Sequence, residues 1–455
     1  MTRARGLVPA VLKRSTFSTS RLLDFVSEKE LTLQCGYGPE DWPLVAIKEL
    51  VDNALDACEE QGVTPEITVM VNEGNIAVAD NGAGIPAEVV DALLDFSVRV
   101  SSREAYVAPD RGAQGNALKT VVAMPFVLDG EQGRVDIIGG GFQSEIAFCV
   151  DRIRQRPAAD VSRSVKAGSV VRIHWPPKAS SEGQWKDPFL QNEPLSDRIR
   201  RLCDDFTFLN PHLTLTLDCF GEVTRTEATS PGWEKWTPSS PTSPHWNEPE
   251  HLERLIGAYV TNSSHNGHAG RTVREFVSEF KGLTSTIKQK AVLAEVGLAR
   301  APLSSLIAGR DFDHDKIARL LGTMKAQAKP VLPRALGTIG RTHLAARFAQ
   351  LGIRDGSFEY NKVQSLDDGD GLPQVTEVAF AALEDESAGR RLITGVNWSA
   401  AWVNPFRTLG GYGRSLDTLM SGRRFERKRP IALLVHVAHP RVPYADCGKS
   451  TVLAR

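Results

Sequence analysis

The chain has 455 residues, of which 41% are hydrophobic and 24% are charged, the usual balance of a folded globular protein. Its formal net charge of −1, from 54 basic and 55 acidic residues, excludes a wholly basic nucleic-acid coat protein. At roughly 100–200 residues per domain, this length predicts two to four domains. No apolar run approaches the ~18 residues of a membrane helix, so we expect no membrane association.

Six cysteines are scattered along the chain without a CxxC pair. This distribution is typical neither of a disulfide scaffold nor of a zinc module, and it predicts a reducing, cytoplasmic location. The first 21 residues carry five basic residues and no acidic one. They lack the apolar core of a signal peptide, so we expect an arm that is disordered or binds a partner.

In the first half of the chain, helices are expected to alternate with short strands. Apolar residues recur at helical spacing from Leu44 to Leu55 and predict a helix over residues 41–57. Alternating and β-branched residues predict strands at 66–71, 76–79, 126–128, 134–138, 144–151, 169–175 and 213–217. This mixture is typical of an α+β fold with two layers.

The composition changes after residue 229. Residues 230–250 contain five prolines and three tryptophans, which predicts a linker or a wrapped loop. Helices are then expected at 272–281, 285–296, 314–328 and 342–350. Strands return at 374–383, 392–398 and 431–438, with a helix near 416–421. The order is therefore α+β, then helical, then α+β.

The most informative segment is KELVDNALDA, residues 48–57. Glu49, Asn53 and Asp56 lie at i, i+4 and i+7 and would share one helix face. A carboxylate can orient and activate a water molecule, and an amide oxygen can ligate Mg²⁺. This face suits a magnesium nucleotide, although an amphipathic helix with a polar outer face is the alternative.

Three glycine-containing motifs follow this helix. The first, DNGAGI (residues 80–85), places a carboxylate at a strand end, where it can accept a hydrogen bond from an adenine amino group. Its two glycines allow the backbone to approach a base closely, although Asn-Gly is also a common turn. The second, RGAQGNA (residues 111–117), runs into an expected helix, whose backbone N–H groups suit phosphates. The third, Gly168-Ser169, begins a strand.

Together these motifs resemble the Bergerat ATP-binding fold of the GHKL superfamily, which includes gyrase B, the large heat-shock chaperones, histidine kinases and MutL. Within it, KELVDNALDA, DNGAGI and RGAQG are most similar to the B-type subunit of topoisomerase VI, the ATPase component of type IIB topoisomerases. The resemblance implies a two-layer GHKL domain with an N-terminal arm (1–232), a linker (233–270), a helical helix-two-turns-helix-like domain (271–352) and an α+β transducer domain like ribosomal S5 domain 2 (353–455).

The resemblance also implies ATP and Mg²⁺ as cofactors. Glu49 would be the general base that polarises the attacking water, and Asn53 would ligate Mg²⁺. Asp80 would read the adenine amino group with Gly84 beneath the base, and Ser169 would support Asp80 through a water. The other residues expected at the nucleotide, including the glycine-rich lid, are Asp56, Gly82, Ile85, Arg111, Gly112, Gln114, Gly115, Asn116, Ala117 and Lys119.

Two features depart from that pattern. The family has a lysine after an Asn-Trp pair of the transducer, and this lysine reaches the terminal phosphate; here Ser399 follows Asn397-Trp398. Lys119, Lys449 or an arginine could substitute for it. The chain also ends at Arg455, where the family continues into a long helix. We expect either a truncated chain or a different coupling to the partner.

Two basic groups are candidates for DNA contacts or are simply solvated surface. One is the run of five cations between Arg423 and Arg429. The other lies in the helical stretch and comprises Arg310, Lys316, Arg319, Lys325, Lys329, Arg334, Arg341 and Arg347. Contacts with the phosphate backbone are largely electrostatic and would suit these cations, but the sequence leaves both interpretations open. His265 and His268 are expected to be loop residues and not metal ligands.

The resemblance therefore implies an ATPase, the ATP-hydrolysing subunit of a topoisomerase VI-like enzyme. It would form an ATP-dependent homodimer, act on duplex DNA and work with a separate A-type cleaving subunit, because no acidic cleavage cluster is visible here. The alternative is a stand-alone ATP-gated clamp or sensor in DNA repair or defence. A chaperone-like ATPase is a third possibility, which the helical insert disfavours.

Overall fold

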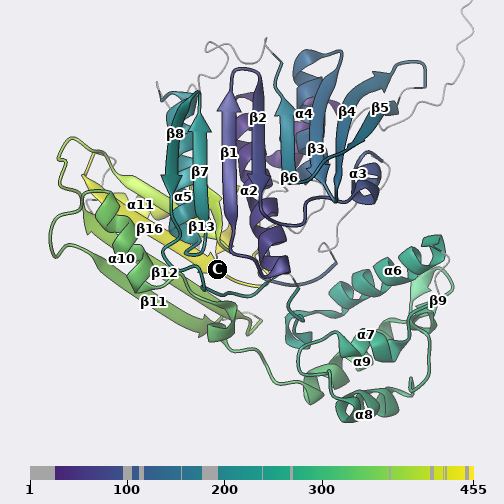
Figure 1. Ribbon diagram of the computed structural model, residues 1–455. Helices are drawn as coiled ribbons and strands as arrows, with labels where there is room; N and C mark the ends of the chain where they lie inside the picture. Colours follow the sequence, from purple (N-terminus) through teal and green to yellow (C-terminus); the bar gives the residue numbers. More distant parts are fainter. Residues whose placement is uncertain are drawn as a thin grey trace, which may run out of the picture.

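The computed structural model describes residues 26–95, 105–111, 117–154, 156–176, 193–237, 239–266, 270–367, 370–409, 415–423, 425, 428–445 and 450–454. Two α+β parts pack together, and a helical part stands beside them (Figure 1). No helix within these ranges has the length and apolar character to cross a membrane.

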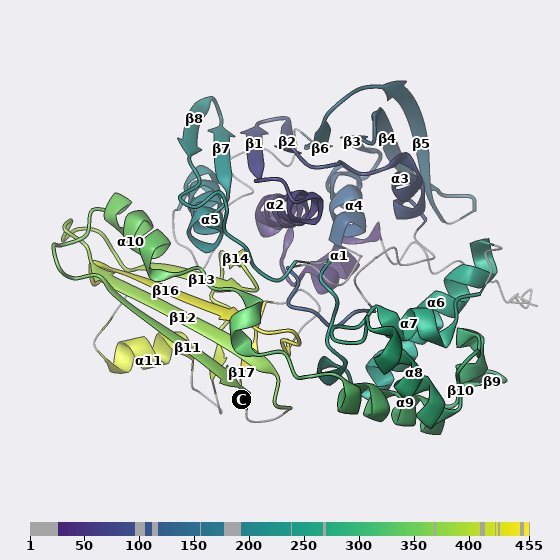
Figure 2. The ribbon, with the colours of Figure 1, turned by 60° about the horizontal axis from the view of Figure 1, so that its bottom comes forward.

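The first part is built on an eight-stranded sheet of order β5-β4-β3-β6-β2-β1-β7-β8. Its strands are β1 (Glu66–Asn72), β2 (Asn75–Asp80), β3 (Gly133–Gly139), β4 (Phe142–Asp151), β5 (Arg156–Val165), β6 (Ser169–His174), β7 (Thr214–Cys219) and β8 (Glu222–Thr226). Its helices are α1 (Glu28–Cys35), α2 (Trp42–Gln61), α3 (Ala87–Leu93), α4 (Ala117–Asp129) and α5 (Leu195–Leu209), with a short 3₁₀ turn, η2 (Pro39–Asp41). Figure 2 shows α5, α2 and α4 along one face of the sheet.

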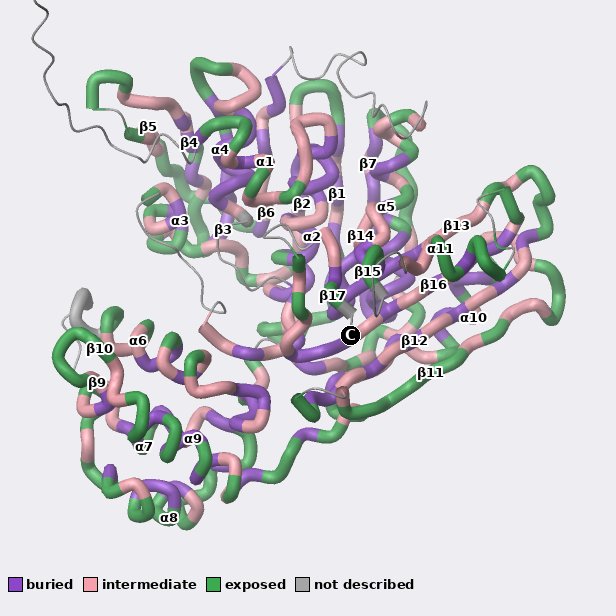
Figure 3. Tube along the Cα trace, turned by 180° about the vertical axis from the view of Figure 1, so that it is seen from behind, coloured by how far each residue is buried: buried purple, intermediate pink, exposed green. Residues whose placement is uncertain are grey.

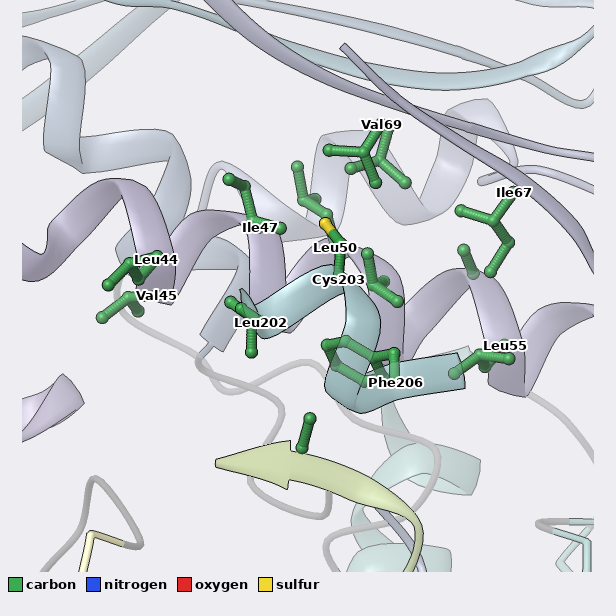
Figure 4. Close-up of a cluster of buried hydrophobic side chains, with 14 of the residues drawn as sticks. Leu44, Val45, Ile47, Leu50, Leu55, Ile67, Val69, Leu202, Cys203 and Phe206 are labelled. Carbon is green, nitrogen blue, oxygen red and sulfur yellow. The ribbon is translucent and has the colours of Figure 1, made fainter. Parts of the chain in front are cut away.

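Helix α2 is the centre of this layer. It buries Leu44, Ile47 and Leu50 against α5 and the sheet (Figure 4). The helix predicted from the apolar spacing is confirmed, and it continues to Gln61. Gly62, with a φ of 69°, ends it, because glycine adopts the left-handed conformation without a Cβ clash.

One predicted strand of this part is a helix in the structure, and two of its elements were not predicted. Residues 126–128 were predicted as a strand, but they form the last turns of α4. The prediction was wrong because a short apolar run does not distinguish a strand from a buried helix segment. In the helix, Phe126 packs edge-on against Phe148 of β4, with ring centroids 5.5 Å apart. Helix α5 and strand β5 were not predicted.

The helical part has its own apolar core. It contains α6 (Pro249–Asn266), α7 (Val273–Ser278), α8 (Thr286–Val296) and α9 (His314–Gln327), with η4 (Leu303–Leu306) and the two-residue strands β9 (Ile307–Ala308) and β10 (Asp311–Phe312). Helix α6 lies inside the segment expected to be a linker. Its Leu252, Leu255 and Ile256 are buried with residues of α7 and α9, so it packs as part of the helical core.

The proline-rich segment before α6 is a wrapped loop rather than an open linker. Trp236 and Trp246 are 3% and 1% exposed, and their rings lie 4.7 Å apart. The short turn η3 (Pro244–Trp246) is followed directly by the helical part. His245 Nε2 lies 2.9 Å from the carbonyl oxygen of Ala328, so the chain enters and leaves the helical part at neighbouring points.

The helical part also touches the first part near the glycine-rich motif. Tyr106 and Tyr259 of α6 share a hydrogen bond between their hydroxyl groups. Tyr259 also donates to Glu279 Oε2 at 2.8 Å, and Arg271 stacks on its ring at 4.4 Å. Tyr106 and Ala105 pack against the helical core, which links the segment 105–111 to α6.

The last part is a five-stranded sheet of order β11-β12-β16-β13-β14. Its elements are η5 (Pro333–Leu336), α10 (Arg341–Gln350), β11 (Glu359–Leu366), β12 (Pro373–Ala382), β13 (Arg391–Val396), β14 (Ser399–Ala401), β15 (Thr408–Leu409), α11 (Leu416–Gly422), β16 (Ile431–Ala438) and β17 (Leu453–Ala454). The strands predicted near β12, β13 and β16 are confirmed.

One continuous apolar core joins the two α+β parts. Val375, Ile393 and Leu434 belong to the same buried cluster as Leu50 and Phe206, and α5 packs against β13 and β14. Figure 3 shows buried segments in both sheets, whereas β11 at the sheet edge is largely exposed. The α+β architecture expected from the sequence is therefore confirmed.

Candidate nucleotide site

Asp80 is held at the end of β2 by two hydrogen bonds. In the sheet it pairs directly with Ser169 of β6, whose Oγ donates to Asp80 Oδ2 at 2.7 Å. The backbone N–H of Gly82 donates to Asp80 Oδ1 at 2.8 Å. Burial raises the pKa of the Asp80 carboxyl, and these two hydrogen bonds oppose that rise. The carboxylate is thus fixed in position, and its contact with Ser169 is direct.

Position 84 requires a glycine because the backbone of β3 lies close to it. Its φ is +69°, and an added Cβ would lie 2.6 Å from Gly139 Cα in β3. A Cβ on Gly82 would lie 2.9 Å from Asp80 Oδ1. Ile85 is partly buried and packs on the main core. These residues shape the loop after Asp80 whether or not a base lies above it.

The three polar residues expected on one face of α2 have different surroundings. Asn53 is exposed, and the Glu49 side chain is 23% exposed. Asp56, in contrast, is 1% exposed. Glu49 and Asn53 can therefore reach a ligand outside the helix, whereas Asp56 points into the protein.

Asp56 and Arg111, both expected at the nucleotide, form a buried ion pair. Arg111 Nη1 donates to Asp56 Oδ1 at 2.7 Å, and Arg111 Nη2 donates to Glu59 Oε1 at 2.7 Å. Burial opposes the charge on Arg111, but the carboxylates of Glu59 and Asp56 raise its pKa. The first residue of the RGAQG motif thus anchors that motif to α2.

The ion pair belongs to a larger buried network. Lys235 Nζ lies 2.7 Å from Glu59 Oε2 and 4.9 Å from the ring centre of Trp398. His212 Nε2 lies 3.1 Å from Glu59 Oε1, and Asn210 donates to the Trp398 carbonyl at 3.0 Å. Against the effect of burial, Arg111 and Lys235 lower the pKa of Glu59 well below its usual range.

Sequence reasoning missed Glu59, Lys235, His212 and Asn210. Glu59 is in α2, Asn210 and His212 follow α5, and Lys235 follows β8. No spacing in the sequence relates them, so only the tertiary structure brings them together. They connect α2 to the Asn397-Trp398 turn.

Two residues of the segment expected to form or flank the glycine-rich lid, Ala117 and Lys119, lie in α4. Gly112, Gln114, Gly115 and Asn116 lie outside the described residues. Ala117 begins α4, and nothing is described of its side chain. Lys119 is 5% exposed and donates to the carbonyl of Asp95, and burial lowers its pKa. In this structure Lys119 is therefore engaged with the main chain after α3.

The Asn397-Trp398 turn places Ser399 against α2. Both turn residues have positive φ, 50° and 62°, as tight hairpins require. Ser399 Oγ donates to Asp52 Oδ2 at 2.6 Å. Lys48 Nζ lies 2.9 Å from the same oxygen and 3.3 Å from Glu49 Oε1. Lys449 lies outside the described residues, and Lys48 was not among the expected cations.

The described side chains fit Mg²⁺ and ATP. No group of three His, Cys, Asp or Glu side chains among them is arranged to hold a metal ion. Magnesium bound with a nucleotide does not need such a cage, because phosphate oxygens and water supply most of its ligands. The exposed amide of Asn53 can supply one more oxygen, and Asp80 offers a fixed acceptor.

Comparison with known proteins places this site in a family. Residues 38–179 match the family described as Histidine kinase-, DNA gyrase B-, and HSP90-like ATPase. The chain carries a GHKL ATPase domain. The matched residues of the GHKL domain include α2, the Asp80 loop and Ser169, so the resemblance seen in these motifs is confirmed.

Curated relatives of the GHKL domain are named as the B-type subunit of type 2 DNA topoisomerase 6. The protein from Archaeoglobus fulgidus is 35% identical over 96 residues, which are 20% of this chain and 16% of that relative. The protein from Halobacterium salinarum is 35% identical over 100 residues, which are 20% of this chain and 12% of that relative. The match thus spans less than a fifth of either relative.

Solved structures similar to this chain include two ATPase regions. The gyrase B ATPase domain of Thermus thermophilus aligns over 90% of this chain and 80% of its own, with 13% identity and a TM-score of 0.34. The topoisomerase II ATPase region of Saccharomyces cerevisiae aligns over 90% and 76%, with 12% identity and a TM-score of 0.39. At these scores the identification of the GHKL domain rests on the sequence match.

Proposed function

We propose that this chain binds and hydrolyses ATP with Mg²⁺ as the ATPase subunit of a topoisomerase VI-like enzyme. The observation that carries the proposal is the pairing of Asp80 with Ser169, together with the accessible Glu49 and Asn53, within the segment that matches the GHKL family. The names of the relatives support the finer assignment to the B-type subunit.

Each residue would have a defined task in hydrolysis. Asp80 would accept a hydrogen bond from the adenine amino group, and its own contacts with Ser169 and Gly82 would hold it there. Glu49 would orient and polarise the attacking water, and Asn53 would hold Mg²⁺ through its amide oxygen. The metal, when bound, neutralises charge on the phosphates.

The proposed partners follow the names of the relatives. ATP binding would favour a closed homodimer, since a ligand that binds one state more tightly shifts the equilibrium towards it. Duplex DNA would be held by this clamp, and a separate A-like subunit would cleave it. A cytoplasmic location stays a prediction from the cysteine pattern.

Exposed cations are available for contacts with such DNA. Arg310, Lys316, Arg319 and Lys329 are exposed in the helical part, and Arg334 and Arg341 are exposed in the last part. Arg347 is not available, because it is 1% exposed and donates to the carbonyl of Glu227 at 2.7 Å. Its expected place among the DNA-facing cations was wrong, since α10 turns this side chain into the core.

A stand-alone ATP-gated clamp in repair or defence is the second candidate. The observation that favours it is Ser399, which donates to Asp52 where the resemblance implies a phosphate-binding lysine. Strand passage would require a cleaving partner, whereas a clamp would close on DNA alone.

Light scattering with Mg²⁺ tests the proposal. A non-hydrolysable ATP analogue should convert a monomer into a dimer, and Glu49→Gln should retain this response while losing ATP turnover. Glu73→Gln, in an exposed turn, is the matched control and should behave as the wild type. Absence of nucleotide binding or turnover in the wild-type protein would refute the assignment.

A further inference from the structure

A transducer residue contacts the catalytic helix directly. Ser399 begins β14, and its hydroxyl donates to Asp52 Oδ2 at 2.6 Å, although the two residues are 347 positions apart in the chain. Both groups are buried: Asp52 is 2% exposed and Ser399 is 7% exposed. The contact therefore reports where the β13–β14 hairpin lies relative to α2.

The position of Ser399 is fixed by a rigid turn. Asn397 Oδ1 accepts from the backbone N–H of His439 at 2.8 Å, and Asn397 Nδ2 donates to the His439 carbonyl at 3.1 Å. The N–H of Trp398 donates to His436 Nε2 at 3.2 Å. Because the turn is tied to the end of β16, Ser399 moves only if the transducer sheet moves with it.

Lys48 bridges this contact to Glu49. Its Nζ lies 2.9 Å from Asp52 Oδ2 and 3.3 Å from Glu49 Oε1. A buried carboxylate needs a compensating charge and hydrogen-bond donors, and Asp52 Oδ2 receives both Lys48 and Ser399. The other oxygen, Asp52 Oδ1, has no hydrogen-bond partner among the residues that the structure describes, so the carboxylate is held through one oxygen shared by the two donors.

We propose that Lys48 is a positioning residue for Glu49, held in place through Asp52 by Ser399 of the transducer. This rests on the proposed ATPase function, in which Glu49 is the base. Docking of the hairpin holds Lys48 against Glu49 and so fixes the carboxylate that orients the water. Withdrawal of the hairpin removes the Ser399 hydrogen bond, and hydrolysis then slows without loss of nucleotide.

Steady-state ATPase kinetics on the full-length protein test the linked contacts from Ser399 to Glu49. Lys48→Met should lower kcat by about tenfold or more, whereas affinity for a non-hydrolysable ATP analogue should stay within about twofold. Lys48→Arg should recover most of the rate, because it restores the cation. Lys362→Met, on the exposed strand β11, is the control for loss of a lysine and should match the wild type.

Ser399→Ala keeps the proposal testable if Lys48→Met does not fold, because it removes a single hydroxyl. Its kcat should fall by about threefold to tenfold at unchanged analogue affinity. In the double variant Lys48→Met/Ser399→Ala, kcat should be no lower than in Lys48→Met alone, since the two residues act through one path. Ser365→Ala, on exposed β11, is the matched control.

The outcomes separate this inference from the proposed function. Wild-type kcat in Lys48→Met or in Ser399→Ala would overturn the positioning role, as would independent, multiplicative losses in the double variant. Equal losses of kcat and analogue affinity would also overturn it, because a purely structural contact would affect both. If Glu49→Gln still hydrolyses ATP, Glu49 is not the general base, and the proposed mechanism is refuted.

Discussion

Arg111 and Asp56 form an ion pair inside the GHKL domain, with Nη1 and Oδ1 2.7 Å apart and side chains 0% and 1% exposed. Arg111 precedes the glycine-rich lid, and Asp56 lies on the helix that carries Glu49 and Asn53. The start of the lid is therefore tied to α2 by buried charge. This relationship gives both residues a structural task, and their expected contact with the nucleotide stays a prediction.

Loss of this arginine should destabilise the protein strongly. Arg111→Met would leave Asp56 and Glu59 without their guanidinium partner, and breaking a buried ion pair from one side costs about 3–5 kcal/mol. Urea unfolding should show this loss in the free energy of unfolding. Arg154→Met removes an arginine that is 69% exposed and should change stability by less than about 0.5 kcal/mol; an equal effect of both variants would contradict the prediction.

Asp80 should govern nucleotide affinity more than stability. Asp80→Asn replaces an acceptor oxygen by a donor, so binding of a fluorescent ATP analogue should weaken about tenfold or more. Ser169→Ala removes one hydrogen bond to Asp80 and should weaken binding by a smaller factor. Asp355→Asn, at an exposed turn, is the control, and affinity in Asp80→Asn equal to that control would remove Asp80 from the site.

Gly84 and Gly62 allow strain and steric contact to be measured separately. Both have a φ of +69°, but an added Cβ meets Gly139 Cα at 2.6 Å only at Gly84; at Gly62 no atom of the described residues lies within 4 Å. Gly62→Ala should cost about 1–2 kcal/mol, the strain of a left-handed residue. Gly84→Ala should lower the free energy of unfolding by more than this, in thermal or urea unfolding, and should also weaken binding of the ATP analogue. Equal losses in the two variants would show that the loop after Asp80 can shift to accommodate the added Cβ.

His343 should make stability depend on pH between about 4 and 6.5. Burial lowers its pKa from the ordinary 6.5 to about 4. The hydrogen bond that its Nε2 donates to the Phe208 carbonyl at 2.9 Å opposes this shift but does not cancel it. A depressed histidine pKa means that the unfolded chain binds the proton more readily. The stabilisation is complete above pH 6.5 and is lost as the pH falls towards 4.

The difference in unfolding free energy between the wild type and His343→Gln should therefore grow with pH by about 3 kcal/mol across this window, since each pKa unit corresponds to about 1.4 kcal/mol. Above pH 7 the difference should be constant. His314→Gln, at a side chain that is 61% exposed, provides the comparison. A pH-independent difference for His343→Gln would contradict the assignment of a buried neutral imidazole.

The sequence predicted the elements whose residues obey a local rule. The spacing of Leu44, Ile47 and Val51 predicted α2, because burial on one helix face imposes a fixed period. The strand near β16 was predicted from an apolar run of strand length, Ile431–Val435. The resemblance implied that Ser169 supports Asp80 through a water, whereas the structure has a direct hydrogen bond between the two side chains. Residues 126–128 were misassigned because three apolar residues carry no period.

The buried network could not be predicted in the same way. Glu59, Arg111, His212 and Lys235 are charged or polar residues of ordinary composition, and their burial depends on how α5, the wrapped loop and the transducer hairpin pack. Lys48 and Ser399 illustrate the same limit. The resemblance showed that Ser399 stands where a lysine is expected. That Ser399 donates to Asp52 is seen only in the tertiary structure, which brings β14 against α2.

The hydrogen bond between His245 and Ala328 has a consequence for how this chain can be rearranged. Entry and exit lie side by side, and the buried core of α6–α9 is distinct from the core shared by the GHKL and transducer parts. The helical part is therefore a compact insert, whose further contact with the first part is made through Ala105 and Tyr106. A short flexible bridge can close the gap left by its excision. Other helical bundles can likewise be grafted between the same two residues without cutting the unit that contains Glu49, Asp80 and Ser399.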